Sequence, residues 1–167
     1  MPYISHLTNR PVVDSEGEAL GHVQEVYAIQ SEGESHPVIT AIAVRNKEEI
    51  NTYPISEVTV LFSPVIPLAH PKQNLSHYTL TGDELPLIDD ILDKQILDTD
   101  GIRVVRVNDL EIAKVSNDFF VSNVDIGSLG IIRRIGLPRF LENLLSKIWR
   151  PNPQNSISWD YVEPLRH

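Results

Sequence analysis

The sequence repeats one phrase at an interval of 84 residues, and this repeat limits the fold more than any other feature. Aligning Gly17 with Gly101 places RPVVDSEGEALGHVQEV (10–26) over KQILDTDGIRVVRVNDL (94–110). The matched apolar positions are Val12, Val13, Leu20, Val23 and Val26 in the first copy and Ile96, Leu97, Val104, Val107 and Leu110 in the second. Further along, YPISEVTVL (53–61) lies over ISWDYVEPL (157–165). Two matches in the same order predict two copies of one unit.

Each copy has the pattern of a small β unit. Val, Ile and Thr form short runs, and Asp, Ser, Asn and Gly bound them as turn residues. Residues 36–45 read as a strand and residues 110–126 as a hairpin. Units of this size with several short strands usually hide their edges by curling into a barrel. We therefore predict a mainly β chain with two small β-barrels in tandem, over residues 1–80 and 81–167.

Two stretches have a helical pattern. DELPLIDDILD (83–93) begins with acidic residues, which favour a helix N-terminus, and its length suits a short connector. LPRFLENLLSKIW (137–149) has apolar residues on one helical face and predicts an amphipathic helix. The second copy is longer than the first, so we place this helix in an insertion at about 127–150. Residues 62–82 read as a linker with an edge strand.

The composition excludes several classes of protein. With 41% hydrophobic and 22% charged residues, the chain is expected to fold. It contains no cysteine, which excludes disulfides and thiolate metal sites. No apolar run is long enough to span a bilayer, and the start lacks the pattern of a signal peptide, so a cytoplasmic protein is expected. The net charge of −9 argues against a general nucleic-acid surface.

The insertion is the main candidate for a binding surface. Residues 127–150 hold five basic residues and one acidic residue, a local charge of +4 in a chain of net charge −9. Such asymmetry can mark a docking surface for an acidic partner, and an anionic membrane surface is an alternative that we do not favour. A simpler alternative is that the apolar stripe covers an open end of the second barrel. The candidate docking residues are Arg133, Arg134, Arg139, Phe140 and Trp149.

No residue set predicts a reaction, a cofactor or a firm metal site. The acidic turns before Gly17 and Gly101 lack the ligand spacing of a calcium loop. We interpret them as hairpin turns in which an aspartate accepts a backbone hydrogen bond and the glycine takes a positive φ. The acidic residues of 83–93 could hold Mg²⁺ weakly, although a solvated helix face explains them better. No nucleophile, base and orienting residue stand in a catalytic pattern, so we expect no enzymatic activity.

The paired phrases resemble the PRC-barrel domain, a small β-barrel. NRPVVDSEGEALGHVQEV with YPISEVTVL carries the resemblance in the first copy, and DILDKQILDTDGIRVVRVNDLEI with ISWDYVEPL carries it in the second. The second copy is similar to the second barrel of bacterial proteins in which paired PRC-barrels precede an MgtE-type N-terminal domain and CBS domains. Such proteins continue beyond the point that corresponds to His167.

The resemblance implies a non-catalytic binding or regulatory module associated with magnesium transport. Its expected partner is an MgtE-type or CBS domain, in the same chain or in another one, and self-association stays open. The resemblance also extends to the ribosome-maturation factor RimM, so a ribosome-assembly factor is a second hypothesis. A module that senses Mg²⁺ through the acidic residues of 83–100 is a third.

Overall fold

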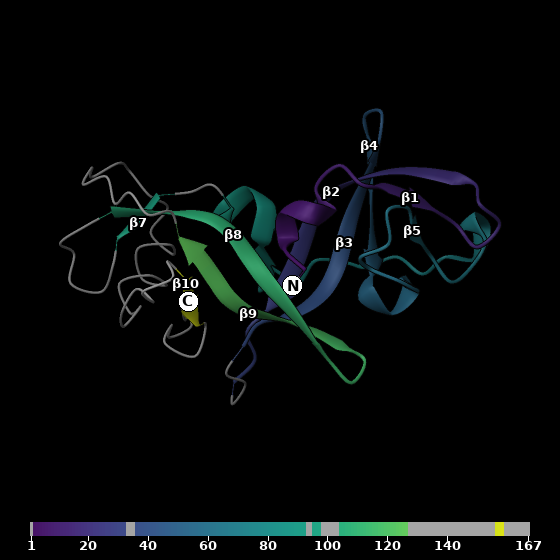
Figure 1. Cartoon of the computed structure of the whole chain (residues 1–167). Coiled ribbons are helices and arrows are strands. Elements are labelled where there is room, and N and C mark those ends of the chain that lie inside the picture. Colours follow the sequence, from purple (N-terminus) through teal and green to yellow (C-terminus); the bar gives the residue numbers. More distant parts are fainter. Residues whose placement is uncertain (1, 33–35, 93–94, 98–103, 127–155, 159–167) are drawn as a thin grey trace. The chain divides into compact units, whose positions relative to one another are not determined.

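The computed structural model describes residues 2–32, 36–92, 95–97, 104–126 and 156–158. These residues are mainly β (Figure 1), which confirms the predicted fold class at that level. The chain divides into two compact units. Pro2–Ile29 and Ile39–Asp89 form one, called here the N-terminal unit, and Gln30–Val38 with the chain from Asp90 onward forms the other, called the C-terminal unit. The helix predicted within 127–150 lies outside the described residues.

The first part of the chain alternates strands with short helical turns. Its elements are η1 (Ile4–Leu7), β1 (Pro11–Val13), β2 (Ala19–Ile29), β3 (Val38–Asn46), β4 (Glu49–Pro54), η2 (Ile55–Glu57), β5 (Ile66–Pro67), η3 (Lys72–Asn74), β6 (Leu85–Pro86) and η4 (Leu87–Ile91).

The sheet of the N-terminal unit is curled and barrel-like. β1 pairs antiparallel with β2, β3 pairs antiparallel with β4, and β2 lies between β1 and β3. β1 also pairs in parallel with β5, and the chain after β4 contacts β5 through a bridge between Val58 and Leu68. In addition, Thr59 N–H donates to Pro67 O at 3.0 Å. These bonds link the two ends of the strand order.

The stretch 62–82 was predicted to be a linker with an edge strand. The edge strand is confirmed, because β5 ends the strand order beside β1, but the linker was wrong for much of the remaining stretch. Ile66, Leu68 and Leu75 are buried, and β5 is hydrogen-bonded to β1. The apolar side chains of this proline-rich segment stabilise the unit because they are removed from water. The many turn-forming residues of the segment gave no indication of this burial. The segment belongs to the core rather than to a connection.

The core follows the apolar positions of the repeat. In the first copy Val12, Leu20, Val23 and Val26 are buried, and in the second copy Val107 and Leu110 are buried. The centre of β3 is buried at four consecutive residues, Ala41–Val44, so both of its faces are covered. Burial on both faces explains why β3 lacks the alternation of a strand with one solvent-exposed face.

The C-terminal unit contains a long hairpin. Its strands are β7 (Gln95–Leu97), β8 (Val104–Val115), β9 (Asp118–Ile126) and β10 (Ser156–Ser158). β8 and β9 pair antiparallel on either side of Ser116 and Asn117, which confirms the hairpin predicted at 110–126 and extends its first strand. Residues 36–38 add to β9, since Val38 pairs with Phe120 and Val121 N–H donates to Pro37 O at 3.0 Å.

The strand pairs reproduce the register of the sequence repeat. In the first copy Pro11 pairs with His22 and Val12 with Gly21. In the second copy Gln95 pairs with Arg106 and Ile96 with Val105, which are the same positions moved by 84 residues. The order also repeats, because β4 follows and pairs with β3 as β10 follows and pairs with β9. Two of the three pairs thus agree between the copies, and the third differs, because Val13 pairs with Ala19 whereas Leu97 pairs with Val104. The two tandem barrels stay a prediction.

The connector helix predicted at 83–93 was wrong in extent. Its first residues instead form β6, in which Leu85 pairs with Ala28 and Pro86 with Tyr27. The helical part is a single π-helical turn, Leu87–Ile91. Pro86 has no N–H and fixes its own φ, so it marks the point where the helical turn begins. The acidic pattern alone did not reveal the strand pairing.

Candidate functional site

The docking residues predicted from the sequence cannot be placed in the fold. Arg133, Arg134, Arg139, Phe140 and Trp149 lie outside the described residues, and the docking role of these residues stays a prediction. The described part of the chain contains two other surfaces with features of binding sites. Both belong to the N-terminal unit.

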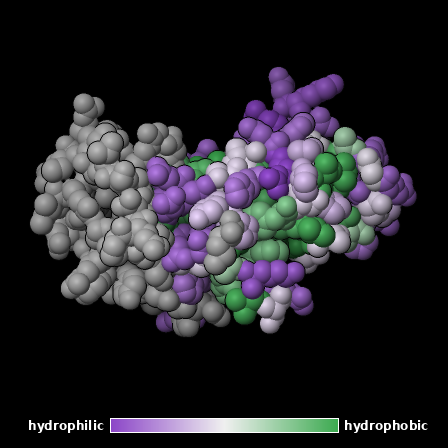
Figure 2. Space-filling view, in the orientation of Figure 1, coloured by the Kyte–Doolittle hydropathy of each residue, from purple (hydrophilic) through white to green (hydrophobic). Residues whose placement is uncertain are grey.

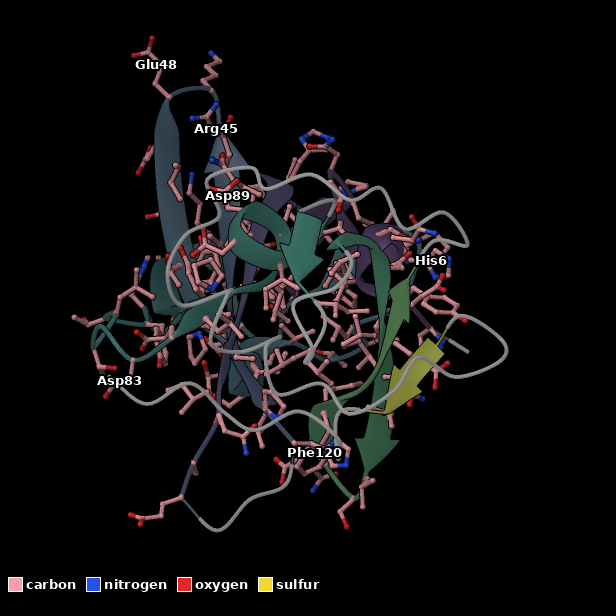
Figure 3. All side chains as sticks on the ribbon, turned by 90° about the vertical axis from the view of Figure 1, so that its left-hand side faces the viewer. His6, Arg45, Glu48, Asp83, Asp89 and Phe120 are labelled. Atoms are coloured by element: carbon pink, nitrogen blue, oxygen red, sulfur yellow. The ribbon has the colours of Figure 1, made fainter. Side chains whose placement is uncertain are left out.

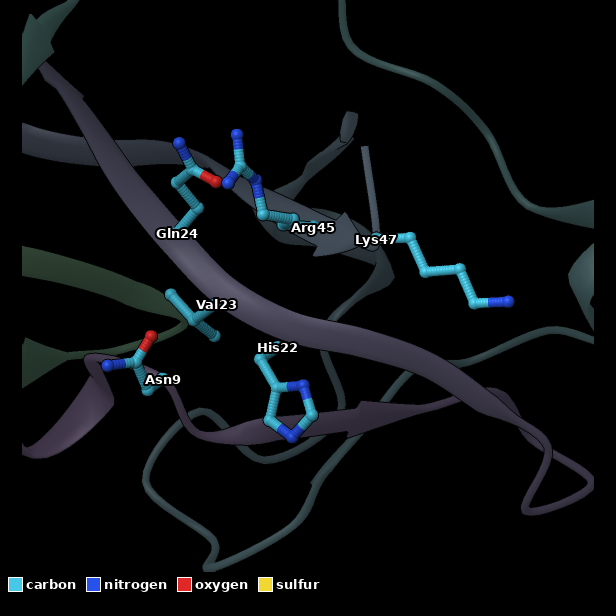
Figure 4. Close-up of a pocket in the computed structure, with 6 residues that line it drawn as sticks. All are labelled: Asn9, His22, Val23, Gln24, Arg45 and Lys47. Carbon is cyan, nitrogen blue, oxygen red and sulfur yellow. The ribbon is translucent and has the colours of Figure 1, made fainter. Parts of the chain in front are cut away.

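The first surface is an open groove of about 690 Å³, shown in Figure 4. We call it the cationic groove. It is lined by Asn9, His22, Val23, Gln24, Arg45 and Lys47. These residues come from the segment before β1, from β2, from the end of β3 and from the β3–β4 turn, and Lys47 extends outward from the rest (Figure 4). All except the buried Val23 are exposed polar or basic side chains, so the groove presents hydrogen-bond donors to solvent.

The backbone around the groove is closely fixed. Asn9 N–H donates to Val23 O at 3.0 Å, and Val23 N–H donates to Arg10 O at 2.9 Å. Gly21 lets β2 approach β3, since a Cβ at Gly21 would lie 2.2 Å from the carbonyl oxygen of Arg45. Asn9 and Lys47 have positive φ values of 61° and 59°. Lys47 thus stands in a turn conformation that L-residues adopt at a cost, at the edge of the groove.

The second surface is the loop at residues 59–65, called here the apolar loop. Val60 is 51% exposed and Val65 is 44% exposed. Arg10 fixes the backbone of the loop, because its Nη1 donates to Phe62 O and Ser63 O, each at 3.2 Å. Hydrophobic surface is visible over the region of β5 in the space-filling view (Figure 2). A fixed loop therefore displays two apolar side chains to solvent.

The turn of the first hairpin has the structure that its sequence predicts. Asp14 is buried, and its carboxylate accepts from Glu16 N–H at 2.9 Å, Glu18 N–H at 2.8 Å and Lys72 N–H at 2.9 Å. Gly17 has a φ of 82°. Burial alone raises the pKa of Asp14, but these hydrogen bonds and the Lys72 charge outweigh it, and the pKa lies below its ordinary value. The matching turn at Asp98 lies outside the described residues.

A second buried carboxylate fixes the loop after β5. Glu57 is 3% exposed and contacts His70 Nδ1 at 2.5 Å with Oε1, while Oε2 accepts from Ser76 N–H at 2.7 Å. Ala69 N–H donates to the Glu57 carbonyl at 2.7 Å. Glu57 therefore ties the segment 69–76 to η2 by both its backbone and its side chain.

A third carboxylate, Glu25, anchors the helical turn at 87–91. Its side chain on β2 accepts from Ile88 N–H at 2.6 Å and Asp89 N–H at 2.9 Å. Burial raises the pKa of Glu25 above its ordinary value, because the hydrogen bonds compensate only part of the lost hydration. The anchor explains how so short a helical turn is held in place.

Glu84 organises the turn before β6. Its carboxylate accepts from Tyr78 O–H at 2.6 Å and from the N–H groups of Thr81 and Gly82. Burial alone raises the pKa of Glu84, yet these hydrogen bonds outweigh it and lower the pKa from 4.5 to about 2. The folded state thus stabilises the charged form of Glu84.

The low pKa of Glu84 predicts an acid-dependent part of the stability. A carboxyl group whose pKa is lower in the folded than in the unfolded state stabilises the fold above the unfolded pKa. This contribution is lost as the pH falls from about 4.5 towards about 2. We expect E84Q to lower the melting temperature at pH 6 and to change it little at about pH 2. Exposed Asp83 provides the control, since D83N should show no such trend; an equal loss at both pH values would contradict the assignment.

The acidic residues predicted to hold Mg²⁺ do not form a cluster where they are described. Asp83, Glu84, Asp89 and Asp90 are placed, whereas Asp93, Asp98 and Asp100 lie outside the described residues. Within the part of the chain that the structure describes, no group of three His, Cys, Asp or Glu side chains is arranged to hold a metal ion. Glu84 instead accepts hydrogen bonds from its own turn.

Comparison with known proteins does not assign the chain to a family. The chain matches no protein-family model, and no curated protein matches it significantly. Among the described residues there is also no helix with the length and apolarity needed to cross a membrane.

Sequence reasoning missed both surfaces. The cationic groove joins residues from β2, β3 and the segment before β1, and strand pairing decides which of them become neighbours. One signal was present: the chain has only four Lys and Arg residues before position 90, and Arg45 and Lys47 stand two residues apart at a turn.

Proposed function

We propose that this chain is a tandem PRC-barrel adaptor that binds a protein partner and has no catalytic role. The resemblance of both copies to PRC-barrels supports this class. The partner is an MgtE-type N-terminal domain or a CBS domain of a magnesium-transport system, in the same chain or in another one.

The apolar loop is the observation that carries the proposal among the described residues. Val60 and Val65 are about half exposed, although apolar side chains gain from burial. Their loop is already fixed by Arg10 and by the bonds between Thr59 and Pro67 and between Val58 and Leu68. A partner that covers this loop gains apolar contact while ordering few flexible groups, which is the usual advantage of a preorganised surface.

Charge substitution in the apolar loop tests the proposal. We expect the double variant V60D/V65D to bind a purified CBS or MgtE-type domain at least about tenfold more weakly, which corresponds to about 1.4 kcal/mol. Calorimetric titration of the wild-type and variant chains measures the effect. The melting temperature should change less than for a buried valine, because both side chains are already about half exposed.

Val115 supplies the matched control. It is 59% exposed at the end of the β8–β9 hairpin, so V115D adds a charge to another apolar surface site. Binding by V115D should equal that of the wild type. If the wild type binds neither domain, the proposed partner is wrong; if V60D/V65D binds as tightly as V115D, the loop assignment is wrong.

The basic segment predicted from the sequence has its own test. We expect R133E/R134E to lose capture of the same domains, because the substitution reverses two charges in the segment of local charge +4. Affinity capture with purified domains at constant salt measures the loss. Unchanged capture would remove Arg133 and Arg134 from the docking surface.

A further inference from the structure

The basic residues of the N-terminal unit fall into two groups. The unit contains four Lys and Arg residues and ten Asp and Glu residues, a net charge of −6. Arg10 donates to carbonyl oxygens of the apolar loop, and the positive charge of Lys72 interacts with the carboxylate of Asp14. Arg45 and Lys47 form no ion pair and no side-chain hydrogen bond with another described residue. These two remaining basic residues both line the cationic groove.

The other lining residues suit the same kind of ligand. His22, Gln24 and Asn9 each supply at least one N–H donor, and all three are exposed. Arg45 and Glu48 lie at the same end of the β3–β4 hairpin (Figure 3), but Glu48 is not among the lining residues. Figure 2 shows this hairpin as a strongly hydrophilic projection. The groove therefore presents two positive charges and neutral donors around one opening.

We propose that the cationic groove binds an acidic segment of a protein partner. The inference rests on the proposed function for the class of partner and adds its chemistry. The guanidinium and ammonium groups pair with carboxylates, and the neighbouring amide and imidazole groups donate to carboxylate or backbone oxygens. An open polar groove suits a chain segment, whereas small ligands are usually enclosed by apolar pockets.

The surrounding charge selects a short ligand. Charges on the surface act over about 10 Å at 0.1 M salt. A short acidic segment in the groove lies against Arg45 and Lys47, whereas Glu48 does not line the groove. A nucleic acid would extend over the rest of a unit of net charge −6 and would be repelled. The groove thus favours a local acidic stretch over a long polyanion.

A defined peptide tests the inference. The probe is a fluorescent eight-residue peptide of alternating Glu and Gly, and the same peptide with Gln in place of Glu is the neutral reference. We expect the wild-type chain to bind the Glu peptide, and to bind it at least tenfold more weakly at about 1 M than at about 0.1 M salt, because screening shortens the range of the charges. Fluorescence anisotropy measures both affinities.

Charge reversal locates the site. K47E should weaken binding of the Glu peptide at least fivefold, while K114E, the same change on exposed Lys114 of the C-terminal unit, should leave it unchanged. The variant R45E/K47E should instead prefer a peptide of alternating Lys and Gly. Equal effects of K47E and K114E would overturn the assignment, because they would reflect net charge alone.

Two further results separate the possible failures. If tripolyphosphate competes as well as the Glu peptide does, the groove is a small-anion site and the segment proposal is overturned. If the wild type binds no acidic probe but still binds a CBS or MgtE-type domain, the groove inference fails and the proposed function stands. If the wild type binds the Glu peptide but neither domain, the proposed partner fails and the groove inference stands.

Discussion

Replacement of Gly21 by alanine is expected to lower the free energy of unfolding by about 3 kcal/mol, a large loss for a single methyl group. A Cβ at this position would lie 2.2 Å from the carbonyl oxygen and 2.7 Å from the carbonyl carbon of Arg45. Both atoms belong to the backbone of β3, so relief requires that β2 and β3 move apart. In addition, Gly21 has a φ of 134°, a conformation that L-residues rarely adopt. Urea unfolding at 25 °C measures the loss.

Gly17 provides a control that separates the two causes. It also has a positive φ, of 82°, but a Cβ there would meet no atom within 4 Å. G17A should therefore cost only the conformational strain, about 1–2 kcal/mol. If G21A costs no more than G17A, the close approach of β2 and β3 does not limit this site. The same separation of strands would deform the cationic groove, so G21A should also weaken binding of the acidic peptide.

The repeat explains why part of the fold could be predicted. The sequence alignment matches Val12 to Ile96 and Gly21 to Val105. In the structure Val12 lies opposite Gly21 on neighbouring strands, and Ile96 lies opposite Val105 in the same way. Local patterns of this kind are visible because turn residues and alternating apolar residues act over a few positions. Asp14 could be assigned to the turn for the same reason, since two of its hydrogen-bond donors, Glu16 N–H and Glu18 N–H, are close in sequence.

Contacts between distant residues could not be predicted in this way. Lys72 N–H donates to Asp14 across 58 positions, and Ile88 N–H donates to Glu25 across 63 positions. Neither contact produces a periodic pattern in the sequence. Residues 62–82 were therefore predicted to be a linker with an edge strand, and residues 83–93 a helix. The apolar loop was missed for the same reason, because only the bonds from Arg10 show that it is fixed.

Gly21 also shows how the two copies have diverged. Its counterpart is Val105, which occupies the same register position opposite Ile96. A valine at position 21 would collide with the backbone of β3, so the approach of β2 to β3 that borders the cationic groove depends on a residue that only the first copy has. We infer that the groove is a property of the first copy and not of the repeat. Function in this chain is therefore expected to follow the differences between the copies.

Loss of the Glu57 carboxylate should have the second largest effect on stability. E57A leaves Ser76 N–H without its acceptor and separates His70 from η2, at a site where Glu57 is 3% exposed. Hydrogen bonds to a charged group contribute about 1.5–3 kcal/mol, and water can replace part of the loss because Ser76 and His70 are both exposed. We expect E57A to lower the free energy of unfolding by about 2 kcal/mol. The segment 69–76 should become accessible to hydrogen exchange before the rest of the unit.

The isosteric variant E57Q distinguishes hydrogen bonding from charge. The amide oxygen of a glutamine can accept from Ser76 N–H, and its NH₂ group can donate to His70 Nδ1 when the imidazole carries its proton on Nε2. A change of tautomer thus restores both contacts, so E57Q should cost about 1 kcal/mol, less than E57A. A double-mutant cycle with H70A measures the coupling, which should be large for E57A and small for E57Q. Equal losses for E57A and E57Q would show that the charge of Glu57, rather than its two acceptors, holds the loop.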